Sequence, residues 1–544
     1  MSAVATVLLA ASLAVPLAML LSCLSSRIRA RMPSLLAIAP VPALLAALLA
    51  RGAALALPQV MLGLQFALDT PGALLLGVAA LLWTAGGFYA STWLRGIPDA
   101  GRFAVWWLLT LTGSIGVFIA TDLVSFYLVF SMVSLAAYGL IIDDGTPSAR
   151  RNGLIYVALA LLGEAFLLMA FVMLAQAVPN HSLLIRDAVA ALPVSPWRTA
   201  TLTLLLLGFG AKIGIVPFHV WMPLAYRSAP IPAAAVLSGA AVKAGVIGFI
   251  QFLPLHAAQP AWGEALTAAG FLSAFYGVAI GITQSNPKTV LAYSSISQMG
   301  VIAAVLGMGL AAGDNDVALS TSFYAAHHTL VKGALFLAVG VAQISGPRRV
   351  WTVLVPAAIL ALGLGGLPLT GGMLAKLAVK APLGGGAAGL LATVSSAGSA
   401  LLMLHFLGRL AATEAHGPAL STWRLSVPWL VTALASVVVP WVLFLTVIGG
   451  AASDALSPAA LWSSAWPVLL GALLALGLRR WGDSLPRVPE GDVVGLIVLG
   501  STHFARVIGL MLERLDAVLR EWPVAGVLLL TLVVLLAGLM QIGH

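Results

Sequence analysis

Cysteine is almost absent from this sequence, and charged residues are scarce. The 544 residues include one cysteine, Cys23, which excludes an intrachain disulfide and a cysteine-ligated iron–sulfur cluster. Only 8% of the residues are charged, against about 25% in soluble proteins, so a soluble globular chain is excluded. The net charge of +9 therefore indicates membrane topology and not a surface for nucleic acid.

The sequence also lacks the short motifs that hold cofactors or carry hydrolytic chemistry. It has no Walker loop, no zinc-binding motif and no catalytic triad. Gly-x-Gly patterns carry no weight among 55 glycines, which more readily allow close helix packing. We therefore expect no cofactor, no metal site and no catalysis by this chain alone.

Long apolar runs are what the sequence has in abundance, since 61% of its residues are hydrophobic. A membrane-spanning helix needs about 20 mostly apolar residues, and the runs are continuous instead of alternating as in a barrel strand. The prediction is an all-α polytopic membrane protein with about 14–16 transmembrane helices. About sixteen runs centre near residues 13, 42, 81, 112, 131, 164, 208, 242, 273, 299, 331, 362, 397, 438, 468 and 533.

The basic residues between these runs predict an orientation, because cytoplasmic loops are enriched in Lys and Arg. With the N-terminus outside, fifteen basic residues fall in inside loops and three in outside loops, and four more precede the last span on the inside. The first run lacks a basic n-region, so we expect a retained span and not a signal peptide. The expected location is a bacterial inner (cytoplasmic) membrane.

Lysine is distributed unlike arginine. All 21 arginines lie in loops or at span ends, whereas five of the six lysines lie inside predicted spans. Each ionisable group at the bilayer centre costs about 2.5–3.5 kcal/mol, so these groups must face protein or water. A buried lysine can release its proton whereas arginine stays charged, so a row of lysines can pass protons. The candidates are Lys212, Lys243, Lys332 and Lys376; Lys380, near a span end, is equally consistent with snorkelling.

Glu164 is the only acidic residue predicted at the middle of a span. It is a candidate to pair with a lysine and tune it, and the alternative is a hydrogen-bonded structural carboxyl. His219 lies at the cytoplasmic end of the seventh span, where it either shapes an ion entrance or caps the helix.

Helix-breaking residues lie beside two of the buried lysines. Pro217 follows Lys212, and Pro368 precedes Lys376. Interrupted helices near charged groups are typical of ion sites in transporters. They predict discontinuous helices at the seventh and twelfth spans.

The spans divide into four blocks. Residues 1–100 form an N-terminal three-helix segment. Residues 101–255 and 256–412 hold five spans each, and since an odd number reverses orientation we expect two inverted repeats. Residues 413–544 hold C-terminal helices, with an amphipathic surface helix near 496–522 that alternatively links to the last span.

Several motifs resemble one family. Residues 208–223 resemble the seventh-helix motif of the antiporter-like subunits of respiratory complex I, of Mrp-type cation/proton antiporters and of membrane-bound hydrogenases. Residues 228–243, 292–300, 328–336 and 366–376 resemble the eighth, tenth, eleventh and twelfth helices, and 122–127 the start of the fifth. The likeness runs from about residue 60 to 410. It implies a proton path through Lys212, Lys243, His328, Lys332 and Lys376.

Four positions depart from the family pattern. The fifth helix normally carries a Trp-Glu pair that tunes the seventh-helix lysine, but Phe130 and Ser131 stand here. Tyr324 stands where some members have histidine, and Leu224 where many have aspartate. Our hypothesis is that Glu164 replaces the missing carboxylate; otherwise the first half-channel is altered or inactive.

The resemblance implies a proton-translocating antiporter-like subunit of a multisubunit membrane complex, with sodium exchange left open. Expected partners are sibling antiporter-like subunits, small hydrophobic subunits and lipid, with no nucleic acid. An Mrp-like complex ranks slightly above a redox-driven pump of the hydrogenase or NADH:quinone oxidoreductase type. The alternatives are a non-transporting scaffold or coupling subunit and a membrane partner of an inorganic-carbon uptake protein.

Overall fold

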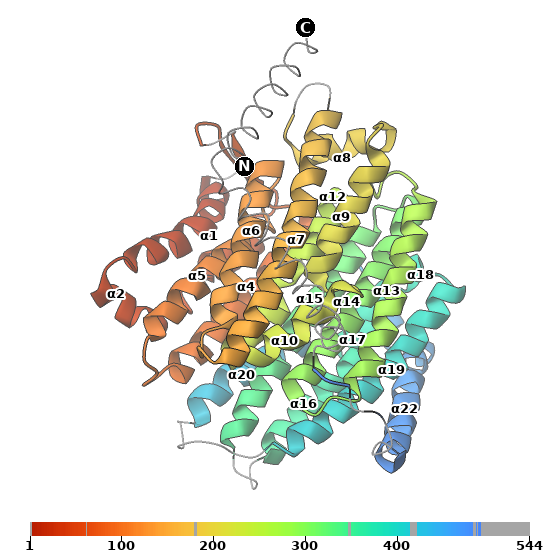
Figure 1. Cartoon of the computed structure of the whole chain (residues 1–544). Coiled ribbons are helices and arrows are strands. Elements are labelled where there is room, and N and C mark those ends of the chain that lie inside the picture. Colours follow the sequence, from red (N-terminus) through yellow and green to blue (C-terminus); the bar gives the residue numbers. More distant parts are fainter. Residues whose placement is uncertain are drawn as a thin grey trace, which may run out of the picture. The chain divides into compact units, whose positions relative to one another are not determined.

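The computed structural model describes residues 3–60, 63–178, 182–345, 350–413, 422–481, 486 and 488–490. The described chain is an all-α polytopic membrane protein, as predicted (Figure 1). Within these ranges, twelve helices are long and apolar enough to cross a membrane. They are α1 (Ala3–Ser22), α4 (Thr70–Trp93), α6 (Leu123–Ile141), α7 (Pro147–Ala177), Arg198–Ser228, Ile231–Phe252, α13 (Pro260–Gly281), α14 (Pro287–Ala312), α15 (Val317–Ile344), α19 (Ala387–Ala411), Trp423–Ile448 and α22 (Pro458–Trp481).

Three of these spans are built from several helical pieces. The span Arg198–Ser228 comprises α9 (Arg198–Ile213), the 3-10 turn η3 (Phe218–Val220) and α10 (Trp221–Ser228). The span Ile231–Phe252 comprises α11 (Ile231–Val236), the π turn η4 (Leu237–Ala241) and α12 (Lys243–Phe252). Helix α20 (Thr422–Leu443) continues into the π turn η5 (Phe444–Ile448).

Three predicted spans are shorter than expected. The run near residue 42 forms only α3 (Val41–Leu49), about 14 Å long, because Pro33 and Pro40 interrupt its first half, whereas Pro42 is tolerated in the first turn of α3. The runs near 112 and 362 form α5 (Ala100–Gly116) and α16 (Val350–Gly365). The run near 533 and the amphipathic helix predicted near 496–522 lie outside the described residues.

Shorter elements connect the spans. They are α2 (Ser26–Arg31), η1 (Met32–Ser34), β1 (Ala54–Leu57), β2 (Leu64–Ala67), α8 (Ile185–Ala191), η2 (Leu192–Val194), α17 (Gly371–Ala378), α18 (Lys380–Leu383) and α21 (Ala452–Ala455). The antiparallel β1–β2 hairpin was not predicted, because two four-residue strands in a loop give no periodic signal. The hairpin meets the start of α6: the Asp122 carboxylate accepts the Gln65 N–H at 2.7 Å and also caps α6. Asp122 thus fixes the first turn of α6.

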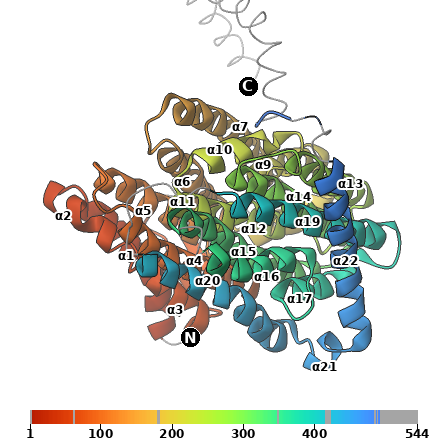
Figure 2. The ribbon, with the colours of Figure 1, turned by 90° about the horizontal axis from the view of Figure 1, so that it is seen from below.

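Helix α15 lies in the interior of the bundle. Figure 2 shows it enclosed by neighbours that include α4, α12, α16 and α20. Every residue in its most apolar stretch is buried. Polar side chains on α15 therefore contact protein and not lipid.

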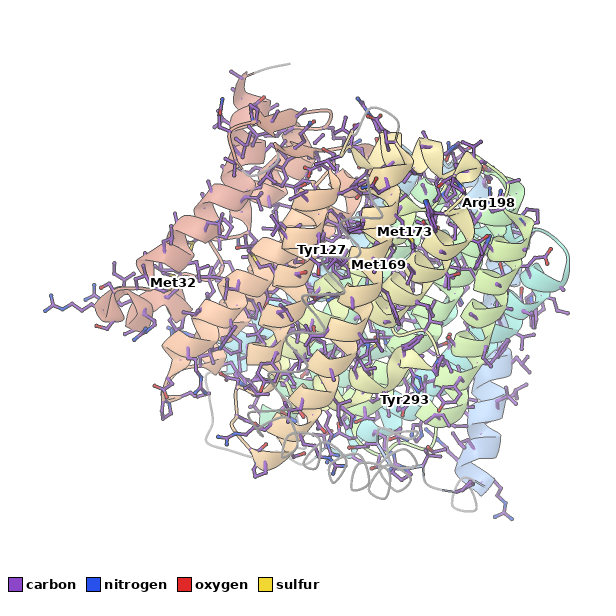
Figure 3. All side chains as sticks on the ribbon, turned by 45° about the horizontal axis from the view of Figure 1, so that its top comes forward. Met32, Tyr127, Met169, Met173, Arg198 and Tyr293 are labelled. Atoms are coloured by element: carbon purple, nitrogen blue, oxygen red, sulfur yellow. The ribbon has the colours of Figure 1, made fainter. Side chains whose placement is uncertain are left out.

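Helix α7 has the opposite environment. Only a third of its most apolar stretch is buried, and Met169 is 52% exposed on its outer face (Figure 3). An apolar face of this kind suits lipid or another membrane subunit.

Glycines hold α13 and α14 in close contact. A Cβ atom built on Gly270 of α13 would lie 2.5 Å from the Gly300 carbonyl oxygen of α14, and Gly300 meets Gly270 in the same way. Gly263 and Gly307 form a second such pair one heptad away. Neither helix can carry a side chain at these points without moving.

Candidate functional site

Lys212 lies at the end of α9, where the helix is interrupted. The chain passes through Gly214 (φ +72°) and Pro217 before α10 begins. The Lys212 Nζ donates a hydrogen bond to the Ser134 hydroxyl of α6 at 2.7 Å and stands 5.3 Å from the centre of the Phe130 ring. The amine is therefore aimed into the bundle at α6.

A small cavity adjoins this amine. Its volume is about 20 Å³, room for about one water molecule, and Ser134, Tyr156 and Lys212 supply its polar lining. The Tyr156 hydroxyl donates to the Ser134 carbonyl at 2.7 Å. The surroundings of Lys212 can thus hold a proton carrier beside the amine.

Glu164 lies on α7, near Lys212 but not bonded to it. Its side chain is 5% exposed and within electrostatic range of the Lys212 amine, yet the two form no direct ion pair in the described structure. Among the described residues, its Oε1 atom has no hydrogen-bond partner. The hydroxyls of Ser131 and Ser134 on α6 lie within interaction range of the Glu164 carboxylate, although Ser131 makes no hydrogen bond of regular geometry among the residues described.

Lys243 is the first residue of α12 and contacts α15 directly. Its Nζ lies 2.6 Å from Nδ1 of His328, and both side chains are fully buried. The Nζ also donates to the Ser238 carbonyl at 3.3 Å, inside the π turn that precedes α12. A π turn frees backbone carbonyls from the regular helix pattern, which is why Ser238 can accept this bond.

Close packing joins the two lysine-bearing helices. A Cβ atom at Gly245 of α12 would lie 3.1 Å from the Lys212 Cβ, so the Lys212 stem rests on α12 only two residues beyond Lys243. The structure therefore brings the Lys212 and Lys243 segments side by side.

Lys332 lies one helical turn after His328 on α15. Residues four apart share a face of a helix, so the two side chains line the same side of α15. The Lys332 Nζ donates to the Leu291 carbonyl of α14 at 2.9 Å and is fully buried.

A second polar line runs from α15 to α19 through Tyr324. Its hydroxyl donates to Oε1 of Gln298 at 2.7 Å, and Nε2 of Gln298 donates to the Ser399 hydroxyl at 2.9 Å. Sequence reasoning noted Tyr324 only as a departure from the family pattern and did not foresee this connection.

Lys376 lies on α17, directly after the second interruption. Helix α16 ends at Gly365, Gly366 has φ +98°, and Pro368 lies before α17 begins. The Lys376 Nζ donates to the Gly365 carbonyl at 2.6 Å, a carbonyl at the end of α16. The break therefore supplies the backbone acceptor for the amine.

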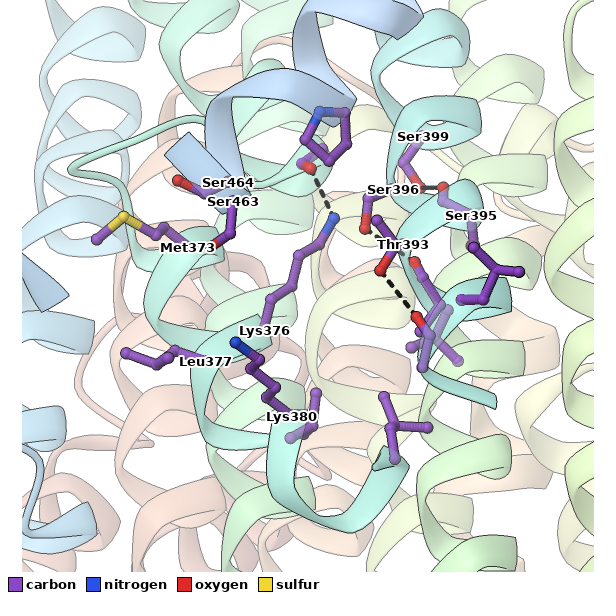
Figure 4. Close-up of a pocket in the computed structure, with 18 of the residues that line it drawn as sticks. Met373, Lys376, Leu377, Lys380, Thr393, Ser395, Ser396, Ser399, Ser463 and Ser464 are labelled. Carbon is purple, nitrogen blue, oxygen red and sulfur yellow. Dashed lines mark hydrogen bonds between the residues drawn. The ribbon is translucent and has the colours of Figure 1, made fainter. Parts of the chain in front are cut away.

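A cavity of about 400 Å³ opens beside Lys376 (Figure 4). Lys380 also lines it, and no carboxylate does among the described lining residues. Helices α19 and α22 supply hydroxyls, namely Thr393, Ser395, Ser396, Ser399, Ser463 and Ser464. Most of these hydroxyls donate within their own helix, as Thr393 does to the Gly389 carbonyl at 2.8 Å. Their lone pairs remain free to accept hydrogen bonds from water or from an ammonium group.

His219 lies in the interior. It is fully buried in η3, and its ring meets Tyr276 of α13 edge-on at 4.8 Å between centroids. His327 was missed by sequence reasoning: it is buried on α15 beside His328. The only sequence signal for His327 is that it directly precedes His328.

Comparisons with known proteins give a family match and several relatives. The family "NADH:quinone oxidoreductase/Mrp antiporter, TM" matches residues 120–401. Hydrogenase-4 component B of Escherichia coli (strain K12) is 28% identical over 291 residues, covering 51% of this chain and 43% of that protein. The Na(+)/H(+) antiporter subunit A1 of Staphylococcus aureus (strain Newman) is 29% identical over 349 residues, covering 58% and 41%. The chain thus matches less than half the length of these curated relatives.

Two solved structures share the fold. A chain of the Mrp complex from Dietzia sp. DQ12-45-1b aligns with a TM-score of 0.76 and 20% identity, over 99% of this chain and 63% of that chain. A chain of the membrane-bound sulfane sulfur reductase, an archaeal respiratory membrane complex, aligns with a TM-score of 0.66 and 19% identity, over 87% and 99%.

Proposed function

The chain belongs to the NADH:quinone oxidoreductase/Mrp antiporter transmembrane family, and from this we propose that it moves protons across the membrane as an antiporter-like subunit of a larger complex. Its curated relatives include an antiporter subunit and a hydrogenase component, and both solved neighbours are parts of multisubunit membrane complexes.

The observation that carries this proposal is the 2.6 Å contact between Lys243 and His328 inside the bundle. Two buried basic groups at this distance share one hydrogen bond, so one of them must have given up a proton. Lys212 adjoins this pair through α12, and Lys332 adjoins it on α15. Alternate protonation along Lys212, Lys243, His328, Lys332 and Lys376 would move charge parallel to the membrane plane between two half-channels.

In this proposal the cavity beside Lys376 is the water-filled access to the second half-channel. Its hydroxyl lone pairs orient water, and Lys380 stands at its lining. We assign His219 the structural one of its two predicted roles, because it is buried in η3 against Tyr276. The blocks 101–255 and 256–412 act as inverted repeats, each with an interrupted helix beside its lysine.

We assign Glu164 the role of the missing fifth-helix carboxylate. The change Glu164→Gln keeps the shape and removes the charge that faces Lys212. We expect proton flux in inverted membrane vesicles to fall about tenfold, because Lys212 would lose the carboxylate that favours its charged form. The complex should remain intact on a native gel. The matched control is Glu264→Gln on α13, where the side chain is exposed, and full transport by Glu164→Gln would refute this role.

The variant Lys212→Ala distinguishes proton transport from a scaffold role. The scaffold is the alternative because Ser131 leaves the fifth helix without a carboxylate. If the chain conducts protons, the proton flux of vesicles that carry this variant should fall at least tenfold. If the chain is a scaffold, the proton flux of the complex should stay the same. Lys212→Arg should fail as well, because arginine holds charge but does not release its proton. Normal flux in both variants would establish the scaffold role.

The partners we propose are sibling antiporter-like subunits and small hydrophobic subunits, with the exposed face of α7 available to them or to lipid. The proposed location is a bacterial cytoplasmic membrane, with the N-terminus outside. We propose that the transported ion is the proton. Exchange of protons for sodium is the second candidate, because the relative from Staphylococcus aureus is named a Na(+)/H(+) antiporter subunit.

A further inference from the structure

His327 and His328 are neighbours on α15 but face different groups. His328 lies within electrostatic range of Lys243 and Lys332, on the side of the first half-channel. His327 lies within electrostatic range of Lys376, on the side of the second. Successive residues on a helix point about 100° apart, so the two imidazoles leave α15 in different directions.

The ring of His327 lies against the first turn of α17. A Cβ atom on Gly371 would lie 2.7 Å from its Nδ1, and one on Gly372 would lie 3.1 Å from its Nε2. Two consecutive glycines at the start of α17 are therefore what lets the imidazole approach the break. The same break supplies the Gly365 carbonyl to Lys376.

The imidazole of His327 is buried without a hydrogen-bond partner. The side chain is 3% exposed, and neither ring nitrogen is bonded within the described part of the chain. Leaving a polar group in this state destabilises the fold, so its presence calls for a use. Nε2 of His328 is also without a partner among the described residues.

We propose that His327 is a proton relay that joins the Lys243–His328 pair to Lys376 across the break between α16 and α17. This inference rests on the proposed proton transport. One ring nitrogen of His327 accepts a proton from a ring nitrogen of His328, so that an N–H bond forms on His327 as one breaks on His328. The other nitrogen releases its proton toward the Lys376 Nζ, so each transfer forms one N–H bond and breaks another.

Two variants at this position separate a relay from a packing role. His327→Gln keeps hydrogen-bonding capacity without titration, and His327→Phe keeps a flat ring without nitrogen. The intact complex, in vesicles from its own membranes, is assayed for proton flux, and its assembly is measured on a native gel. Lys243→Met serves as the reference for a broken path. His405→Gln is the matched histidine control, since His405 on α19 bonds the Gln284 carbonyl at 2.7 Å and lies outside the proposed path.

A relay predicts at least a tenfold loss of flux in both His327 variants, with assembly unchanged and His405→Gln active. If either variant keeps more than half the flux while Lys243→Met is inactive, the relay is overturned and the proposed function stands. If both variants lose the assembled complex, His327 is structural and the relay is overturned. If Lys243→Met itself keeps its flux, the proposed function fails and the relay with it.

Discussion

Replacing Lys243 by methionine is expected to stop proton translocation while the complex still folds and assembles. Methionine fills a similar volume, but it cannot carry the proton that passes between Lys243 and His328 across their 2.6 Å contact. Removing the amine relieves the cost of burying it, but it also leaves the His328 Nδ1 and the Ser238 carbonyl without this partner, so we expect the two effects on stability to offset each other in part. The expected loss of flux is more than tenfold.

A loss of proton flux in a complex that still folds and assembles makes the Lys243 experiment specific. Flux is measured in vesicles, and the midpoint of thermal unfolding is measured on the purified complex. Ser238→Ala is a suitable control, because it removes the hydroxyl that meets Ser295 at 3.1 Å but keeps the carbonyl that Lys243 contacts. A variant that loses flux only because it unfolds would count against a place for Lys243 on the path.

Placing leucine at Gly270 should have the largest effect on folding. A Cβ atom there would meet the Gly300 carbonyl oxygen at 2.5 Å, so α13 and α14 would have to separate along their whole contact. Overpacking alone destabilises by about 1–3 kcal/mol, and leucine adds three further carbons. We expect little of the variant to accumulate in the membrane, measured by immunoblot of washed membranes.

The matched control for this change is Gly408→Ala on α19. A Cβ atom at Gly408 meets nothing within 4 Å, and alanine favours a helix over glycine by about 1 kcal/mol. This variant should accumulate normally and unfold at the same or a higher temperature. Normal accumulation of Gly270→Leu would mean that the two helices are not held together by this contact.

The sequence predicted the helices and most of the polar residues of the site, because both signals are local. The length of a continuous apolar run predicts a span, and a lysine inside such a run can be recognised as unusual from the local sequence alone. The likeness to a known family then placed Lys212, Lys243, Lys332 and Lys376 in order. The contacts themselves depend on residues far apart in the chain, such as Lys243 and His328, and no local pattern contains them.

Sequence reasoning missed residues whose role depends on contacts with residues far away in the chain. His327 differs from an ordinary core histidine only because Gly371 and Gly372 admit its ring. Glu164 was predicted to lie near a lysine, and the structure places it near Lys212 but without a direct bond. Whether it tunes that lysine is for the Glu164→Gln experiment to decide.

The π turn at Leu237–Ala241 makes the spacing before Lys243 as important as its chemistry. Each residue added to or removed from a helix rotates everything after it by about 100° relative to what came before. The wider turn sets the angular position from which Lys243 reaches His328 and the Ser238 carbonyl. The number of residues from 231 to 243 therefore fixes the direction of the Lys243 side chain, and a single insertion or deletion there would turn the amine away from α15.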